Sequence, residues 1–195
     1  MPAGRPREFD VDEALDRALD VFWRKGYQGT SLLDLTKAMK INRPSLYAAF
    51  GNKEALFRKA MDRYLEGPAC HLHEALEEPT SRQVVERLLC GTIELIAGAR
   101  SPRGCFMVQA ALACGDAAAS VRREMVKRRT ALQAALRERF QRAISEGDLP
   151  PDQDPSDLAR YLSALTHGMA VQAAGGATVD ELKRVSKLAL RAWPP

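Results

Sequence analysis

The sequence lacks the patterns of a membrane protein and of a disulfide-stabilised secreted protein. No apolar run in its 195 residues is long enough to span a bilayer, and no charged segment followed by an apolar one resembles a signal peptide. The four cysteines, Cys70, Cys90, Cys105 and Cys114, are too few and too widely spaced for a disulfide scaffold. We therefore expect reduced thiols and a cytoplasmic location.

Common catalytic and metal-binding motifs are also missing. There is no glycine loop that could cradle phosphate, no metalloprotease motif and no nucleophile elbow, so we expect neither an enzyme nor a cofactor. Cys70 and His73 share one helix face, but no second close pair completes a metal site, and we predict no metal. Strand alternation, repeats and low-complexity segments are absent too, which favours an all-α fold.

A pattern of helix, tight turn and helix is present at residues 30–57. The hydroxyls of Thr30 and Ser31 can cap a first short helix, which stops near Lys40. Asn42 can cap a second short helix. Two short helices joined in this way form a helix-turn-helix unit, whose second helix fits the major groove of DNA.

The outward residues of the second helix suit DNA. Arg43 can donate two hydrogen bonds to a guanine edge, while Ser45 and Tyr47 can bond phosphate oxygens. Ala48 permits close approach, and Lys53 lies at a helix start, where phosphate is favoured. An ordinary three-helix core with a solvated polar face is the alternative. The predicted DNA contacts are Arg5, Arg7, Thr30, Ser31, Asn42, Arg43, Pro44, Ser45, Tyr47, Ala48 and Lys53.

The positive charge of the chain is concentrated near this unit. Of the net charge of +4, residues 1–60 contribute most, with eleven Lys and Arg against eight Asp and Glu. This bias agrees with phosphate binding. Arg5 and Arg7 lie in a segment rich in Pro and Gly, which is either an arm that reaches the DNA or a solvated tail.

The first sixty residues resemble the DNA-binding domain of the TetR family of bacterial repressors. Two departures stand out: Lys40 lies where the family usually has glycine, and the small residues Ala48 and Ala49 lie where bulkier polar ones are frequent. The matching residues are Phe22, Gly26, Tyr27, Thr30, Leu35, Ile41, Ser45, Leu46, Tyr47, Phe50, Lys53, Glu54, Leu56 and Phe57.

The resemblance implies two domains and about nine helices. We expect a helix-turn-helix domain at residues 1–53 and a helical effector-binding and dimerisation domain at residues 54–195. A connector helix is predicted from Lys53 to about Glu77, interrupted at Gly67 and Pro68. In this family a shift of the connector separates the two DNA readers, so the interruption is either a point of movement or a static bend.

Further helices are predicted by apolar periodicity and by breaks rich in Gly and Pro. Ser81 is expected to cap one that carries apolar residues from Val84 to Ile96, and the others are expected at about 105–114, 120–146, 156–174 and 179–193. The basic residues of the 120–146 helix are expected on a solvated face. They are Arg122, Arg123, Lys127, Arg128, Arg129, Arg137 and Arg139.

The TetR resemblance implies a homodimer joined by the last two helices, since a two-fold protein matches an inverted-repeat operator. Packing within one subunit is the alternative. The predicted interface residues are Leu158, Leu162, His167, Leu182, Val185, Leu188 and Trp193.

The resemblance also implies a pocket for a small apolar effector, although Met and aromatic residues more often fill a core. The predicted lining is Cys105, Phe106, Met107, Met125, Phe140, Tyr161, Leu165 and Met169.

Cys105 allows a redox- or electrophile-sensing alternative. It begins a predicted helix just after Arg103, two features that lower a thiol pKa, and the segment 104–107 looks like one in TetR-type repressors that sense electrophiles. The alternative is that Cys105 is only a small buried residue.

We expect a repressor that an apolar effector releases from an inverted-repeat operator. The alternative functions from other classes are a helical enzyme and a non-specific nucleic-acid or protein adaptor.

Overall fold

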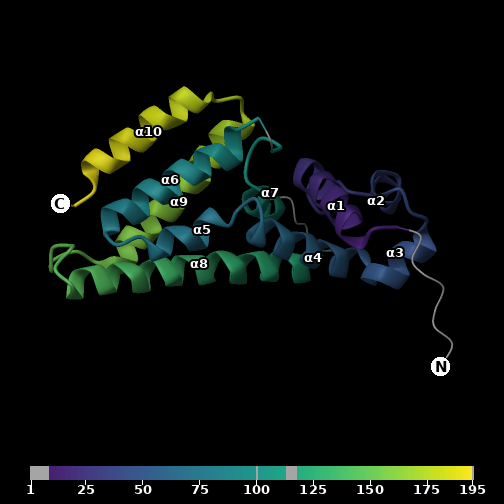
Figure 1. Cartoon of the computed structure of the whole chain (residues 1–195), viewed down its shortest axis with the longest axis horizontal. Helices are drawn as coiled ribbons and strands as arrows, with labels where there is room; N and C mark the ends of the chain where they lie inside the picture. Colours follow the sequence, from purple (N-terminus) through teal and green to yellow (C-terminus); the bar gives the residue numbers. More distant parts are fainter. Residues whose placement is uncertain (1–8, 100, 113–117, 195) are drawn as a thin grey trace.

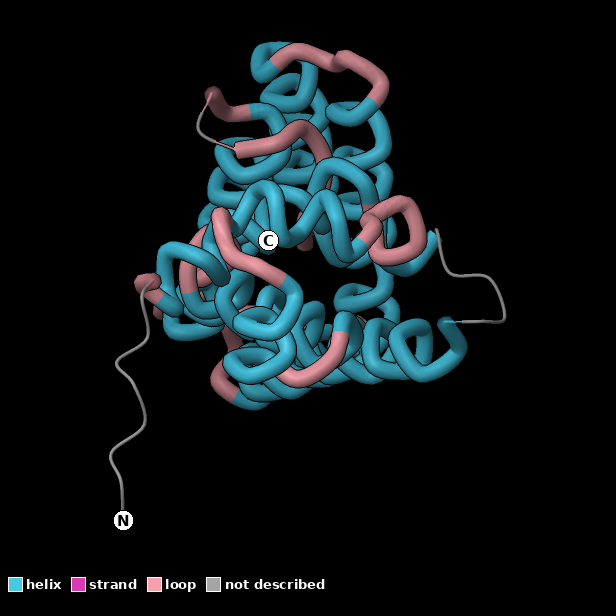
Figure 2. Tube along the Cα trace, turned by 90° about the vertical axis from the view of Figure 1, so that its right-hand side faces the viewer, coloured by secondary structure: helices cyan, strands magenta, loops and turns pink. Residues whose placement is uncertain are grey.

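The computed structural model describes residues 9–99, 101–112 and 118–194, and within these ranges it contains helices and loops but no strand (Figures 1 and 2). The predicted all-α fold is confirmed, with ten α-helices and one short 3-10 helix in the described ranges instead of about nine helices. The helices are α1 (Val11–Lys25), α2 (Leu32–Met39), α3 (Arg43–Phe50), α4 (Lys53–Glu66), α5 (His71–Glu74), the 3-10 helix η1 (Ala75–Glu77), α6 (Ser81–Ala97), α7 (Phe106–Leu112), α8 (Ala119–Ser145), α9 (Pro155–Ala174) and α10 (Val179–Ala192).

Helices α1 to α3 form a compact head at one end of the molecule (Figure 1). Each begins at a residue whose side-chain oxygen accepts hydrogen bonds from first-turn amides: Asp10 for α1, Ser31 for α2 and Asn42 for α3. These caps satisfy backbone donors that have no partner within the helix. The buried side of α1 includes Ala18 and Phe22, both at 0% exposure.

The predicted interruption of the connector is confirmed. Helix α4 ends at Glu66, and the amide of Gly67 donates to the carbonyl of Arg63 at 3.0 Å. Pro68 follows and cannot continue a helical ladder, because it has no amide hydrogen. The connector is therefore one long helix followed by the short α5 and η1.

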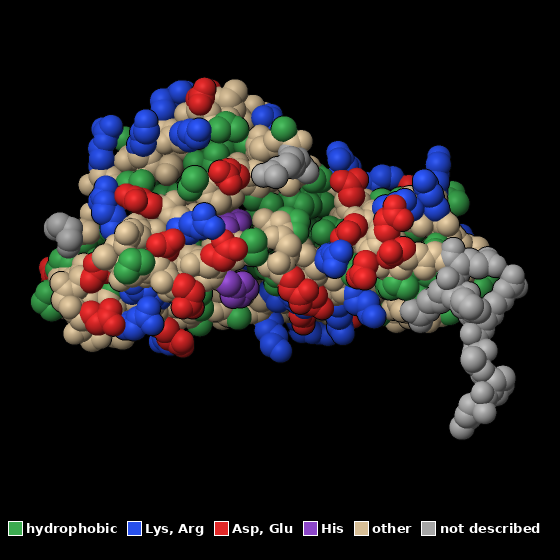
Figure 3. Space-filling model, in the orientation of Figure 1, with side chains coloured by type: hydrophobic (Ala, Val, Ile, Leu, Met, Phe, Trp, Pro, Cys, Tyr) green, Lys and Arg blue, Asp and Glu red, His purple; other side chains and the backbone are tan. Residues whose placement is uncertain are grey.

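Helices α6, α8, α9 and α10 form the body of the protein. Helix α8 runs along one side of it and packs against α9; α6 contacts α9 and α10 (Figure 1). The face that Figure 3 shows carries Lys, Arg, Asp and Glu interspersed, without a large patch of one sign. None of the helices in the described ranges has the length and hydropathy that a bilayer crossing needs.

An aromatic cluster joins the head to the body. Phe106 at the start of α7 is fully buried, and its ring centre lies 5.3 Å from that of Phe57 and 5.5 Å from that of Tyr64, both on α4. Trp23 of α1 meets Tyr64 edge to face at 4.9 Å and donates its indole N–H to the carbonyl of Gly104 at 2.9 Å. The head, the connector and α7 thus share one core.

Lys40 follows the end of α2 and has the left-handed conformation, with φ 56° and ψ 39°. The TetR family usually has glycine at this position. A side chain there meets a steric penalty that glycine avoids. We expect Lys40→Gly to raise the free energy of unfolding by about 0.5–1 kcal/mol, measured by urea denaturation.

The matched control is Lys37→Gly, an exposed position inside α2, where glycine should lower the free energy of unfolding by about 1 kcal/mol. Equal destabilisation by both substitutions would contradict the strain at Lys40.

Candidate functional site

The second helix of the helix-turn-helix unit has one buried and one exposed side. Leu46 and Phe50 are buried at 0% and 3% exposure and fix α3 against the head. The opposite side exposes Arg43, Pro44 and Ala48, together with Tyr47, which is 48% exposed. Arg43 has no hydrogen bond or ion pair among the described residues and is available to an outside partner.

The polar residues around α3 divide into structural and available groups. Ser31 and Asn42 are exposed, but their side-chain oxygens accept from the amides of Asp34 at 3.0 Å and Ser45 at 2.8 Å. Thr30 is 1% exposed, and its hydroxyl donates to the carbonyl of Gly26 at 2.7 Å. The predicted phosphate contact of Thr30 is therefore wrong in this structure, because its hydroxyl closes the end of α1. Arg5 and Arg7 lie outside the described residues.

Lys53 lies at the start of α4, half-buried beside α3. Its ammonium is 4.4 Å from the centre of the Tyr27 ring, and burial lowers its pKa. The face of the ring attracts this ammonium, while part of the Lys53 side chain stays accessible. Lys25 and Ser31 bond Asp34 and hold the pKa of that carboxyl well below its usual range, which fixes the start of α2.

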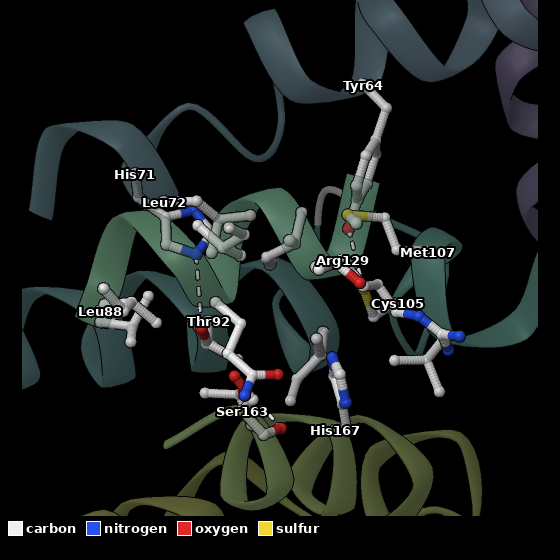
Figure 4. A pocket seen from close by; sticks show the side chains of 18 of the residues that line it. Tyr64, His71, Leu72, Leu88, Thr92, Cys105, Met107, Arg129, Ser163 and His167 are labelled. Carbon is white, nitrogen blue, oxygen red and sulfur yellow. Dashed lines mark hydrogen bonds between the residues drawn. The ribbon is translucent and has the colours of Figure 1, made fainter. Parts of the chain in front are cut away.

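An internal cavity of about 270 Å³ is lined by residues from α4 to α9 (Figure 4). At one end, His71 Nε2 lies 3.4 Å from the Thr92 hydroxyl, near Leu88. Its lining residues are Tyr64, His71, Leu72, Leu88, Thr92, Leu95, Ile96, Cys105, Met107, Val108, Val126, Arg129, Thr130, Leu132, Gln133, Leu136, Ser163, Thr166 and His167.

The sequence identified only part of this cavity. Of the predicted effector residues, Cys105 and Met107 line it. Those that do not are Phe106, Met125 and Phe140, which are packed at 0% exposure, and Tyr161, Leu165 and Met169, which line a surface groove between α9 and α10. Helical periodicity finds the buried side of a helix but cannot separate a packed side chain from one that borders empty space.

Arg129 is the main residue that the sequence pattern missed. It was expected on a solvated face of α8, but it is half-buried and lines the cavity. Arg128 also faces inward and binds Asp62 of α4 at 2.6 Å and Glu124 at 2.7 Å. Arg139 is 5% exposed and donates to the carbonyls of Glu78 and Pro79. The solvated-face prediction is wrong for these three. Arg128 and Arg139 are held by partners on other elements, and Arg129 faces the cavity that neighbouring helices border.

Cys105 has a different environment from the predicted one. Its Sγ lies 3.2 Å from the Tyr64 hydroxyl, and burial raises the pKa of its thiol despite that hydrogen bond. Arg103 points elsewhere, toward the carbonyl of Ala177 at 3.5 Å. The predicted lowering of this pKa is wrong, because desolvation outweighs the helix start.

Both histidines of the cavity have lowered pKa values. For His71 the main cause is burial; for His167 it is burial followed by the positive charge of Arg129. Within the described ranges, no group of three or more His, Cys, Asp or Glu side chains is placed to hold a metal ion.

The predicted interface residues separate into two groups. Leu162, Leu182 and Trp193 are buried within one chain at 0%, 1% and 4% exposure, so their assignment to a subunit interface is wrong in this structure. Leu158 packs partly against the same core, and His167 lines the cavity. Val185 and Leu188 are 38% and 61% exposed on α10.

Taken together, the capped head, the exposed face of α3 and the helical body define a helix-turn-helix DNA-binding protein. The family model described as "Bacterial regulatory proteins, tetR family" matches residues 14–60, and the model described as "Tetracyclin repressor-like, C-terminal domain" matches residues 84–188. The chain belongs to the TetR family of bacterial transcriptional regulators and is not an enzyme.

Relatives match it over nearly the whole length. The transcriptional repressor ComR of Escherichia coli is 33% identical over 98% of this chain and 92% of its own length. The uncharacterised regulator YezE of Bacillus subtilis is 32% identical over 92% of this chain and 94% of its own length. The structure of a cysteine mutant of the TetR family regulator CifR, complexed with 26-base-pair double-strand operator DNA, is 43% identical with a TM-score of 0.93, covering 98% of this chain and 100% of that one.

The lowered histidine pKa values generate a prediction about stability. Below pH 6.5 the unfolded chain binds more protons at His71 than the folded chain does, so the free energy of unfolding should fall as the pH drops through about 6.5. In urea denaturation at about pH 7 and pH 5.5, His71→Gln should lose part of this decline. His73→Gln, at an exposed neighbouring position, should keep it; identical slopes for both variants would contradict the assignment.

Proposed function

We propose that this protein is a repressor that binds an inverted-repeat operator as a homodimer and is released by a small molecule bound in the internal cavity. The observation that carries the proposal is the exposed side of α3, where Arg43 and Tyr47 are accessible on a helix anchored by Leu46 and Phe50. The names of ComR, a repressor, and of CifR in its operator complex support this role. Such a regulator acts where the bacterial chromosome lies, in the cytoplasm.

In the proposed complex, α3 enters the major groove and each residue has a distinct task. Arg43 reads a guanine edge, Tyr47 and Ser45 contact the DNA backbone, and Pro44 and Ala48 allow close approach. Lys53 holds a phosphate at the start of α4. Ser31 and Asn42 act mainly by fixing the two helix starts, since their oxygens already accept backbone amides.

Substitutions at Arg43 and Lys53 should have different consequences. Arg43→Ala should cost about 1–3 kcal/mol on the operator and relax its base preference. Lys53→Met, which removes the ammonium but keeps an unbranched side chain beside Tyr27, should weaken all DNA sequences alike and lower the salt slope by about 1. The measurement is binding to DNA flanking this protein's own gene at two salt concentrations, against scrambled competitor.

Equal loss of specificity in both variants would contradict these roles. If scrambled DNA competes as well as the flanking DNA for the wild-type protein, the non-specific adaptor replaces the repressor.

The homodimer is proposed to form through α9 and α10. Among the described residues, Tyr161 and Val171 of α9 and Val185 and Leu188 of α10 are large apolar side chains with 38% to 61% exposure. Gly168 lies in the groove between the two helices, where a small residue permits close helix packing. A two-fold interface here would cover this surface and provide the symmetry of an inverted repeat.

Leu188→Glu should weaken dimerisation at least about tenfold, because a carboxylate would have to be desolvated in the interface. Analytical ultracentrifugation across a concentration series measures this shift toward the monomer. Leu33→Glu is the control, since Leu33 is 67% exposed on α2 in the head and should leave the oligomeric state unchanged. A dimer constant unaffected by Leu188→Glu would place the interface elsewhere.

Release by an effector is proposed to act through contacts between the cavity and α4. Tyr64 of α4 lines the cavity and also packs on Trp23 of the head, so a change in the cavity reaches the head through one side chain. Arg128 links α8 to Asp62 of the same helix. The alternative of electrophile sensing through Cys105 has less support, because burial raises the pKa of this thiol and lowers its thiolate fraction.

A further inference from the structure

The strongest unassigned feature is a cationic end of the internal cavity. Arg129 of α8 lies beside Cys105 there, and His167 points toward the same end from α9, whereas His71 and Thr92 mark the other end (Figure 4). The lining of the cavity that the structure describes includes this one arginine and two histidines, but no aspartate or glutamate. The electrostatic character of the cavity is therefore positive at one end.

Arg129 has no counter-ion in the described part of the chain. Among the described residues, no carboxylate lies within 4.0 Å of its guanidinium, and neither the Arg129 nor the His167 side chain has a hydrogen-bond partner. The adjacent Arg128 differs, because it is bound to both Asp62 and Glu124. A half-buried guanidinium without a partner has lost part of its hydration. An anion in the cavity would replace the lost water contacts with charge-assisted hydrogen bonds.

The rest of the cavity is mainly apolar. Leu72, Leu88, Leu95, Ile96 and Leu136 contribute side chains to it. Its volume of about 270 Å³ lies just below the usual range for pockets that hold drug-sized ligands. These features suit a short apolar body with one polar end.

We infer that the cavity binds a small amphipathic monocarboxylate, with its carboxylate on Arg129 and His167 and its aliphatic or aromatic body against the leucines and Ile96. This inference rests on the proposed repressor function and changes the expected effector from an apolar molecule to an organic anion. One guanidinium balances one negative charge, which favours a monoanion over a phosphate ester of higher charge.

The site of anion binding also lies next to the connector. Arg129 follows Arg128, whose bond to Asp62 holds α8 against α4. A carboxylate bound to Arg129 lies beside the Tyr64–Cys105 contact, and Arg129 is the sequence neighbour of the residue that forms the bridge to Asp62. Both contacts end on α4, the helix whose position sets that of the head, so the ligand acts on the connector.

The test is isothermal titration of the full chain with benzoate and octanoate, each compared with its neutral amide of nearly equal size, benzamide and octanamide. We expect at least one carboxylate to bind, and its amide to bind at least about tenfold more weakly, because the charge-assisted bonds are lost. Arg129→Met should reduce carboxylate affinity at least about tenfold and abolish the preference over the amide. Arg123→Met, an exposed position on the same helix, should change neither value.

Operator binding is measured in parallel, and it separates the two proposals. Arg129→Met should hold operator DNA like the wild type but resist release by the carboxylate. Three results would overturn the anion site: equal binding of carboxylate and amide, unchanged carboxylate affinity in Arg129→Met, or no carboxylate binding by the wild type. The comparison of carboxylate with amide on the wild-type protein decides the matter even if the variant does not fold. Failure of the wild type to bind operator DNA would instead overturn the repressor function and leave the titration valid.

Discussion

The burial of Phe106 among Trp23, Phe57 and Tyr64 is the contact on which the rest of the structure depends. These four rings come from α1, α4 and α7, and the edge-to-face pairs between them fix the angle at which the head leaves the body. The indole of Trp23 bonded to Gly104 adds a directional constraint. A head joined in this way moves together with α4 and α7, so its orientation is set by the body.

Helix α4 is held from two sides. On one side, Arg63 makes two hydrogen bonds to Asp16 of α1, at 2.7 Å and 3.0 Å. On the other, Asp62 pairs with Arg128 of α8 at 2.6 Å. Neighbouring residues of one helix thus connect the head to α8, which borders the cavity.

Much of the head could be predicted because its signals are local. The predicted caps Ser31 and Asn42 act on amides three residues away, and both are found in the structure. The left-handed turn at Lys40 follows from the same short-range geometry. The hydrogen-bond partner of Thr30 could not be predicted, since a hydroxyl that suits a phosphate bonds equally well to a carbonyl of the preceding turn.

The sequence by itself determined the all-α class, most helix bounds and the exposed side of α3, because periodicity and capping act within about one helical turn. Only the tertiary structure decided which buried residues line a cavity and which fill a core: Phe140 packs on Trp193, whereas Arg129 borders open space. It also decided the pKa of Cys105, because desolvation comes from elements far away in the chain. Such properties depend on what several helices leave between them, and no single helix encodes that space.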